Sequence, residues 1–520
     1  MQTRRLFRHR ACLRAVAWSL LLAVPAMAQS VQSAPNPTSS PAPTPSQPPP
    51  YSDSSPIPDT PAYERAREVL ELVNKGDVSQ YLRYVQESFA PPFRDASEHH
   101  GEVYNDFRSV AGTLTVHGAR TYDPPRPETS AILVVRTGIS EQWMAIILDV
   151  EDAPPYKIAS LNFGRARTPS DLPKAEALSD SQIAQELGAY VERLAKQDAF
   201  SGAVLLAKDG EVLLSAAVGQ ANRDFKVPNT VDTKFNLGSM NKMFTAVAIL
   251  QLAEQGKLSL DDTLAKHLDT SWLSQDILDR VTIRQLLNHT SGLGSYFNET
   301  FERTSRAHFR EVNDYKPLTV GETLAFEPGT KQRYSNTGFL IAGAVVEKAS
   351  GDNYFEYIRK HVTGPAGMSN TDCYQLDHVN DNLAVGYERL IGPGGSPTEY
   401  FNNIFAHVFR GGPAGGGYST VTDLLRFDRA LRAGRLLDKD SLAAAWTRTE
   451  VPQSFDYGLG FFVEDTAVGR AVGHGGDFAG ISAQFRMYLE SGYTVSVLSN
   501  YDGAARLVEA KARELIGQGR

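Results

Sequence analysis

Ser239 and Lys242 lie one helical turn apart in the stretch NLGSMNKMFTAVAILQLAEQGKL, residues 236–258. From Met243 onward, apolar side chains recur at the spacing of an amphipathic helix, and Gly256 is a typical stop signal. Such a helix packs against a core, where an ammonium group is costly to bury. Burial lowers the pKa of a lysine from about 10.4, so a buried lysine can accept a proton from a neighbouring serine near neutral pH. The spacing therefore indicates an activated serine nucleophile.

The Ser-x-x-Lys pattern alone is not specific, because a serine at a helix N-terminus is also a common capping residue. Ser239 is nevertheless the only serine of the chain with a lysine three residues later. Two more motifs follow along the chain: Tyr334-x-Asn336, and His474 with the two glycines after it. Each could be structural by itself, as a turn tyrosine with a capping asparagine and a strand histidine. Their order favours one common active site.

These ordered motifs resemble those of the class C β-lactamase and penicillin-recognising serine hydrolase superfamily, which includes D-alanyl-D-alanine carboxypeptidases and esterases. The resemblance runs from about residue 180 to residue 516. It includes three framework stretches: LLNHTSGL (286–293), GPAGMSNT (364–371) and PAGGGYSTVTDLLRF (413–427). A histidine in the first of them, His289, is expected to be structural.

The resemblance implies a role for each motif residue. Ser239 would be the acylated nucleophile, Lys242 its base or proton relay, and Tyr334 a second proton-transfer group. The backbone N–H groups of Ser239 and Asp477 would form the oxyanion hole. The substrate-binding residues implied are Asn336, His474, Gly475, Gly476 and Asp477.

The third motif departs from the Lys-Thr-Gly or His-Thr-Gly of β-lactamases and many D-alanyl peptidases. Gly475 has no hydroxyl, and His474 is expected to be mostly neutral at pH 7. We therefore expect an esterase or amidase that prefers neutral acyl substrates, unless Ser482 or Arg486 supplies the missing donor. A D-alanyl-D-alanine carboxypeptidase or β-lactamase is the alternative, and a catalytically silent binding module is the alternative that is not an enzyme.

The elements around these motifs predict an α+β fold. A helix over 181–196 and a hairpin over 201–217 precede the Ser-x-x-Lys motif, and a hairpin over 484–499 and a helix over 503–516 follow the third motif. We expect one antiparallel sheet built from both chain ends, flanked by the terminal helices and carrying a helical insertion. This is the β-lactamase-like arrangement, assigned to residues 180–520.

Three further segments precede this domain. Residues 1–28 have an Arg-rich start, a short apolar run and a small-x-small site, which predicts a signal peptide and a periplasmic or secreted protein. Residues 29–61 are Pro-rich and are expected to form a solvated linker. Residues 62–168 predict a small α+β module, with helices over 63–74 and 78–89 and strands over 112–117, 130–136, 143–149 and 156–163. His99 and His100 are expected to lie in an exposed polar loop.

Composition excludes several other functions. The chain has a net charge of −8, and loss of the five arginines in residues 1–28 leaves −13, which argues against a nucleic-acid partner. Cys373 is the only cysteine after residue 28, so no intramolecular disulfide is expected in the mature chain. We find no metal-ligand spacing, no implied cofactor, no Gly-x-Ser-x-Gly motif and no later membrane-length apolar run. The expected partner is a small-molecule or peptide acyl substrate.

Overall fold

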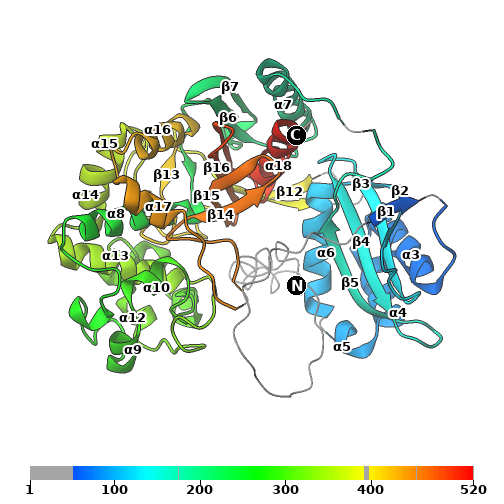
Figure 1. Ribbon diagram of the computed structural model, residues 1–520, viewed down its shortest axis with the longest axis horizontal. Coiled ribbons are helices and arrows are strands. Elements are labelled where there is room, and N and C mark those ends of the chain that lie inside the picture. The colour runs from blue at the N-terminus through cyan, green and yellow to red at the C-terminus, as the bar shows by residue number, and fades with distance from the viewer. Residues whose placement is uncertain are drawn as a thin grey trace. The chain divides into compact units, whose positions relative to one another are not determined.

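The computed structural model describes residues 51–518, apart from residues 55, 96, 174, 392–396 and 453. The predicted signal peptide and most of the predicted linker lie outside the described residues. The described chain forms two compact units, one within residues 51–174 and the other within Ala175–Leu390 and Glu399–Arg520 (Figure 1).

The larger unit is organised around one antiparallel six-stranded sheet. Its order is β14-β15-β16-β17-β6-β7, so the strand pair β17 and β6 joins the two ends of the domain sequence. The prediction of a sheet built from both chain ends is confirmed. The strands are β6 (Gly202–Lys208), β7 (Glu211–Val218), β14 (Phe462–Thr466), β15 (Gly469–Phe478), β16 (Ile481–Tyr488) and β17 (Tyr493–Ser499).

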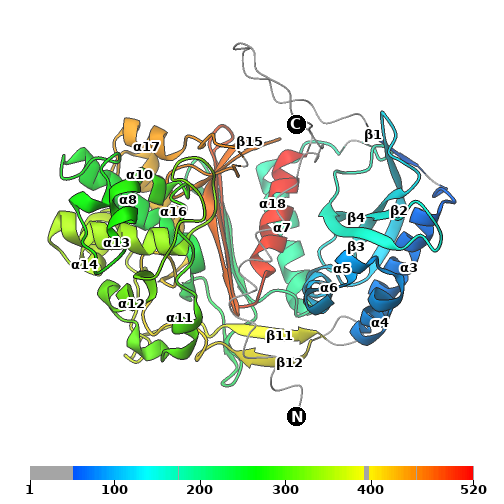
Figure 2. The same ribbon diagram turned by 90° about the horizontal axis from the view of Figure 1, so that it is seen from below.

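Helices cover both faces of this sheet (Figure 2). The terminal helices α7 (Asp180–Lys196) and α18 (Ala504–Gly517) lie on one face, as the sequence predicted. Ser179 and Gln182 form a capping box that fixes the start of α7, and the helix buries one apolar stripe. The other face is covered by the helical insertion.

The insertion surrounds a central helix, α8 (Asn241–Glu254). Residues 241–252 are buried on every side of α8, so the expectation of an amphipathic helix is wrong: α8 runs through the core. Around it lie α9 (Gln275–Arg280), α10 (Ile283–Leu287), α11 (Glu299–Arg303), α12 (Lys316–Thr319), α13 (Asn336–Ser350), α14 (Tyr354–Ile358), α15 (Gly364–Ala366), α16 (Val421–Arg432) and α17 (Lys439–Ala445). Short strand pairs complete the unit: β8 (Gln220–Asn222) with β9 (Val227–Pro228), β10 (Phe235–Asn236) with β13 (Tyr418–Ser419), and β11 (Tyr387–Ile391) with β12 (Pro397–Asn402).

The smaller unit is a five-stranded antiparallel sheet packed against helices (Figure 1). The strands follow chain order: β1 (Tyr51–Ser54), β2 (Leu114–Tyr122), β3 (Ser130–Thr137), β4 (Trp143–Val150) and β5 (Ile158–Arg165). The helices are α3 (Pro61–Lys75), α4 (Val78–Ser88), α5 (Pro91–Arg94) and α6 (Ser97–Ala111). Thr60 caps α3, Pro61 starts it, and Gly76 ends it in the left-handed conformation.

Two sequence expectations for this unit are wrong. Strand β1 lies inside the segment that was predicted to be a linker. This strand pairs with β2, and the buried carboxylate of its Asp53 forms a bidentate ion pair with Arg120 of β2. The His99-His100 pair lies in helix α6 and not in a loop. His100 is buried, and its Nε2 is 2.7 Å from the carbonyl oxygen of Phe93.

Candidate active site

Ser239 lies in a single 3₁₀ turn, Gly238–Met240, directly before α8. It is not a helix cap, since no side chain caps the start of α8. The turn is fixed from both sides: Leu237 N donates to Gly417 O at 2.7 Å, and Gly238 N donates to Asn236 Oδ1 at 2.9 Å. Gly238 has a φ of +50°, a conformation that favours glycine. The turn therefore presents Ser239 in a rigid position.

Lys242 is fully buried, and its Nζ has three partners. Nζ lies 3.1 Å from Ser239 Oγ, 2.9 Å from Asn336 Oδ1 and 2.6 Å from the carbonyl oxygen of Ala414. None of these partners is a carboxylate, and burial lowers the pKa of Lys242 well below its usual value. A neutral amine has two N–H donors, which the oxygens of Asn336 and Ala414 accept. Its lone pair is then left for the hydroxyl proton of Ser239.

Tyr334 lies partly buried beside this pair. The centroid of its ring lies 4.8 Å from Lys242 Nζ. Burial raises the pKa of Tyr334 above its usual value, although a hydrogen bond with Ser239 acts in the opposite direction. The phenol is therefore protonated at rest and is placed to donate a proton near Ser239.

The loop that carries Tyr334 and Asn336 is held by neighbouring groups. His289 Nδ1 accepts a hydrogen bond from Ser335 N at 3.0 Å, and the His289 ring packs 4.3 Å from that of Tyr334. Ser335, and not Asn336, caps helix α13. Asn336 Nδ2 donates to Ser295 Oγ at 3.2 Å, which orients its Oδ1 toward Lys242. His289 is thus a buried supporting residue, in agreement with the structural role expected for it.

His474 is buried on β15, and its two ring nitrogens are both hydrogen bonded. Nδ1 lies 2.5 Å from Gly475 O, a carbonyl that only accepts, so this nitrogen carries the proton. Nε2 then accepts from the hydroxyl of Tyr457 at 2.9 Å. Burial, and secondly the proximity of Lys242, lower the pKa of His474 well below its usual value. The imidazole is neutral, as the sequence analysis expected at pH 7.

Gly476 allows β15 to approach the Ser239 turn. A Cβ on Gly476 would lie 1.9 Å from Leu237 O and 2.8 Å from Ser239 N, so a side chain does not fit there. The backbone nitrogen of Asp477 is equally close to the turn, because a Cβ on Gly238 would lie 3.0 Å from it. The backbone nitrogens of Ser239 and Asp477 therefore lie close to each other. The Asp477 side chain points elsewhere and pairs with Arg506 at 2.5 Å.

Sequence reasoning missed the Ala414 carbonyl and the Tyr457 hydroxyl. Ala414 belongs to the framework stretch that begins PAGGG, residues 413–417. The three glycines after Ala414 are the sequence feature that could have indicated a close approach of this loop to another part of the backbone. A Cβ on Gly415 would lie 2.8 Å from Gly238 O, so a glycine at this position lets the loop reach the nucleophile turn. Nothing in the sequence around Tyr457 marks it as a partner of His474.

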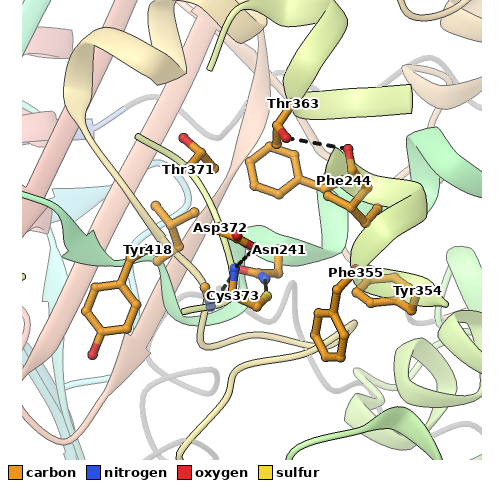
Figure 3. Close-up of a pocket in the computed structure, with 12 residues that line it drawn as sticks. Asn241, Phe244, Tyr354, Phe355, Thr363, Thr371, Asp372, Cys373 and Tyr418 are labelled. Carbon is orange, nitrogen blue, oxygen red and sulfur yellow. Dashed lines mark hydrogen bonds between the residues drawn. The ribbon is translucent and has the colours of Figure 1, made fainter. Parts of the chain in front are cut away.

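Cys373 is not a competing nucleophile. It lies in a small cavity behind the start of α8, where the side chains of Asn241 and Cys373 meet (Figure 3). Asn241 Nδ2 is 3.3 Å from Cys373 Sγ. Burial raises the pKa of the thiol to about 12, so the reactive thiolate is not populated at neutral pH.

In the portion of the chain that the structure describes, no group of three or more His, Cys, Asp and Glu side chains has the geometry of a metal site. None of the described helices is long and apolar enough to cross a bilayer.

Comparison with known proteins agrees with this geometry. The family model described as Beta-lactamase matches residues 185–518. Penicillin-binding protein 4* of Bacillus subtilis (strain 168) is 32% identical over 354 residues, covering 64% of this chain and 76% of that protein. The crystal structure of a penicillin-binding protein from Bacillus halodurans has 30% identity and a TM-score of 0.57, covering 65% of this chain and 99% of that one. A D-stereospecific amidohydrolase from Streptomyces sp. has 27% identity and a TM-score of 0.51, covering 64% and 98%.

The fold and these likenesses define a serine hydrolase of the penicillin-binding and class C β-lactamase type. The chain belongs to the β-lactamase family, whose domain occupies residues 185–518.

Proposed function

We propose that the protein hydrolyses ester or amide bonds through an acyl-enzyme on Ser239. The observation that carries the proposal is the position of Lys242, whose buried amine lies 3.1 Å from Ser239 Oγ and has no carboxylate among its three hydrogen-bond partners. Lys242 takes the proton as Ser239 Oγ bonds to the substrate's carbonyl carbon. The N–H groups of Ser239 and Asp477 stabilise the resulting oxyanion. Tyr334 protonates the leaving oxygen or nitrogen as its bond to that carbon breaks.

Water hydrolyses the acyl-enzyme with the help of the same groups, which now transfer protons in the opposite direction. Water loses a proton to the Tyr334 and Lys242 pair and attacks the acyl carbon, and the bond to Ser239 Oγ breaks as Oγ regains a proton. In this proposal Asn336 also binds the substrate's amide, as the resemblance implies. All of these residues lie within residues 180–520, which we propose as the complete hydrolase domain.

The charges near the third motif support a preference for uncharged substrates. Neutral His474 offers no cation, and Arg506 is paired with Asp477. The two alternative donors are also engaged. Ser482 Oγ donates to Asp477 Oδ1 at 3.1 Å, and Arg486 binds its neighbouring carbonyl at 2.9 Å and Glu464 at 3.4 Å. A substrate carboxylate would have to displace an existing ion pair, so we propose an esterase or amidase in preference to a β-lactamase.

Labelling of Ser239 tests the mechanism. A fluorescent fluorophosphonate should form an adduct on the Ser239 peptide, detected by mass spectrometry, and Ser239→Ala should abolish it with an unchanged melting temperature. Ser291, which is buried and belongs to a framework stretch, provides the control: Ser291→Ala should be labelled normally. Normal labelling of Ser239→Ala would refute the mechanism.

Likeness to penicillin-binding proteins favours a second candidate, a D-alanyl-D-alanine carboxypeptidase or β-lactamase. The kcat/KM values for a p-nitrophenyl ester and for nitrocefin separate the candidates, since efficient nitrocefin hydrolysis would overturn the substrate preference but not the Ser239 mechanism. We also infer export, from the signal-peptide pattern of residues 1–28. Mass analysis of the mature N-terminus tests that inference.

A further inference from the structure

Gln484 is a largely buried residue whose carboxamide has no hydrogen-bond partner among the described residues. It lies on β16 directly opposite Gly475 of β15, and only 4% of its surface is exposed. No group among the described residues bonds its side-chain nitrogen or oxygen. The buried Gln251 differs: its Nε2 donates to the carbonyl oxygens of His361 and Leu436 at 2.9 Å each, and its fully buried Oε1 has no partner. The nitrogen and oxygen of the Gln484 carboxamide are not fully shielded from solvent, so this donor and acceptor are open to a ligand.

The carboxamide of Gln484 occupies the space that a side chain at Gly475 would fill. A Cβ on Gly475 would lie 2.7 Å from Gln484 Nε2 and 3.1 Å from Oε1. On the other side of β15, strand β14 pairs only as far as Gly473, opposite Phe462. Among the described strands, β15 therefore has an unpaired edge beyond this point. Because Gly475 has no side chain, nothing of residue 475 covers the carboxamide at that edge.

This position corresponds to the leaving group of a bound substrate. In the proposed mechanism the substrate's carbonyl oxygen lies at the N–H of Asp477, and the leaving group lies at the proton donor Tyr334. Tyr334 is near His474, with 6.4 Å between ring centroids. The direction along β15 from Asp477 to His474 thus leads from the acyl carbon toward the leaving group. Gly475, with Gln484 beside it, lies between these two points.

We propose that Gln484 binds the leaving group and selects one that carries an uncharged amide. This inference rests on the proposed function. The carboxamide of Gln484 offers a donor and an acceptor, which another amide complements with its C=O and N–H. A carboxylate has acceptors only and would face the Gln484 oxygen, while Arg506 on the same face of the sheet is paired with Asp477. Gln484 therefore favours a leaving group that ends in an amide over one that ends in a free carboxylate.

A pair of thioesters with the same acyl group tests this selection. N-Benzoylglycyl thioesters of thioglycolamide and of thioglycolate differ only in CONH₂ against COO⁻ on the leaving thiol, which is measured with Ellman's reagent. We expect Gln484→Leu to lower the amide-to-carboxylate ratio of kcat/KM about tenfold, the effect of one hydrogen bond. Gly475→Ala should lower the ratio similarly, because its Cβ displaces the carboxamide. Gln251→Leu is the matched control: it loses a buried amide elsewhere and should leave the ratio unchanged.

The outcomes distinguish this inference from the proposed function. If Gln484→Leu and Gly475→Ala both keep the wild-type amide-to-carboxylate ratio of kcat/KM, Gln484 does not bind the leaving group selectively and the inference is overturned. A fall in the ratio for either folded variant, with Gln251→Leu unchanged, supports it. If the wild-type protein hydrolyses neither thioester and forms no adduct on Ser239, the proposed function itself fails.

Discussion

Replacing Asn336 with aspartate places a carboxylate beside the amine of Lys242 without changing the size of the side chain. In the native site the Asn336 oxygen lies 2.9 Å from Nζ and carries no charge. Burial lowers the pKa of Lys242, and a carboxylate at this distance would raise it again by favouring the ammonium form. The variant therefore tests whether the lysine acts as a neutral base.

The geometry sets the expected size of the effect. Two unit charges 2.9 Å apart attract by about 6 kcal/mol at an effective dielectric constant of about 20, which corresponds to about four pKa units. Measured shifts from such neighbours are smaller, about one to three units. A raised pKa keeps Lys242 protonated to higher pH, so the acidic limb of the pH profile of kcat/KM should move upward by at least about one unit.

The assay is kcat/KM for an uncharged p-nitrophenyl ester as a function of pH, with Asn336→Leu as the matched control. Both variants lose the Asn336 amide, but only the aspartate adds a charge. Asn336→Leu should lower kcat/KM by a similar factor at every pH, whereas Asn336→Asp should recover activity as pH rises. If the kcat/KM values of the two variants depend on pH in the same way and differ only by a constant factor, Lys242 is not the base whose pKa governs the reaction.

Two other predictions concern the smaller unit. A chain beginning at Pro173 should fold and keep kcat/KM within about threefold, because every proposed site residue lies beyond it; a folded but inactive product would show that the smaller unit completes the site. Arg120→Met should destabilise the smaller unit by about 3–5 kcal/mol in denaturant unfolding at pH 7, since it leaves Asp53 buried and unpaired. Burial alone would raise the pKa of Asp53, but the bonds from Arg120 and Ser170 outweigh it and hold this pKa below its usual value. The native unit should therefore lose stability as pH falls below about 4. The variant should regain part of its lost stability in the same pH range, because protonation removes the charge of Asp53. A variant as stable as wild type at pH 7 would contradict this account.

The sequence predicted those features that depend on the type of side chain. Ser239, Lys242 and Tyr334 could be recognised because their chemistry, spacing and order are rare together. A single sheet built from both chain ends was predictable from the hairpins at the two ends of the domain. The neutral state expected of His474 followed from its unperturbed pKa, although the structure adds burial as a stronger cause.

Other features depend on contacts that the sequence does not encode locally. The Ala414 carbonyl has no side-chain signature, and any residue supplies the same group. Strand β1 could not be recognised from a hydrophobic period, because its Asp53 is held by an ion pair with Arg120, 67 positions away in the sequence. The register that places Gln484 opposite Gly475 depends on strand pairing, and the fit between the carboxamide and the glycine appears only in three dimensions.

The pairing of β17 with β6 also determines when the enzyme can become active during its synthesis. Strand β6 is made about 290 residues before its partner, since Leu205 pairs with Ser496. The Ser239 turn is likewise complete long before β15 supplies the N–H of Asp477. Because such long-range pairing is slow and leaves an unpaired strand edge until it forms, a growing or truncated chain presents β6 as an aggregation-prone edge. In the proposed mechanism the Ser239 site is therefore complete only when the whole domain has been made, and we expect an incomplete chain to have no hydrolase activity.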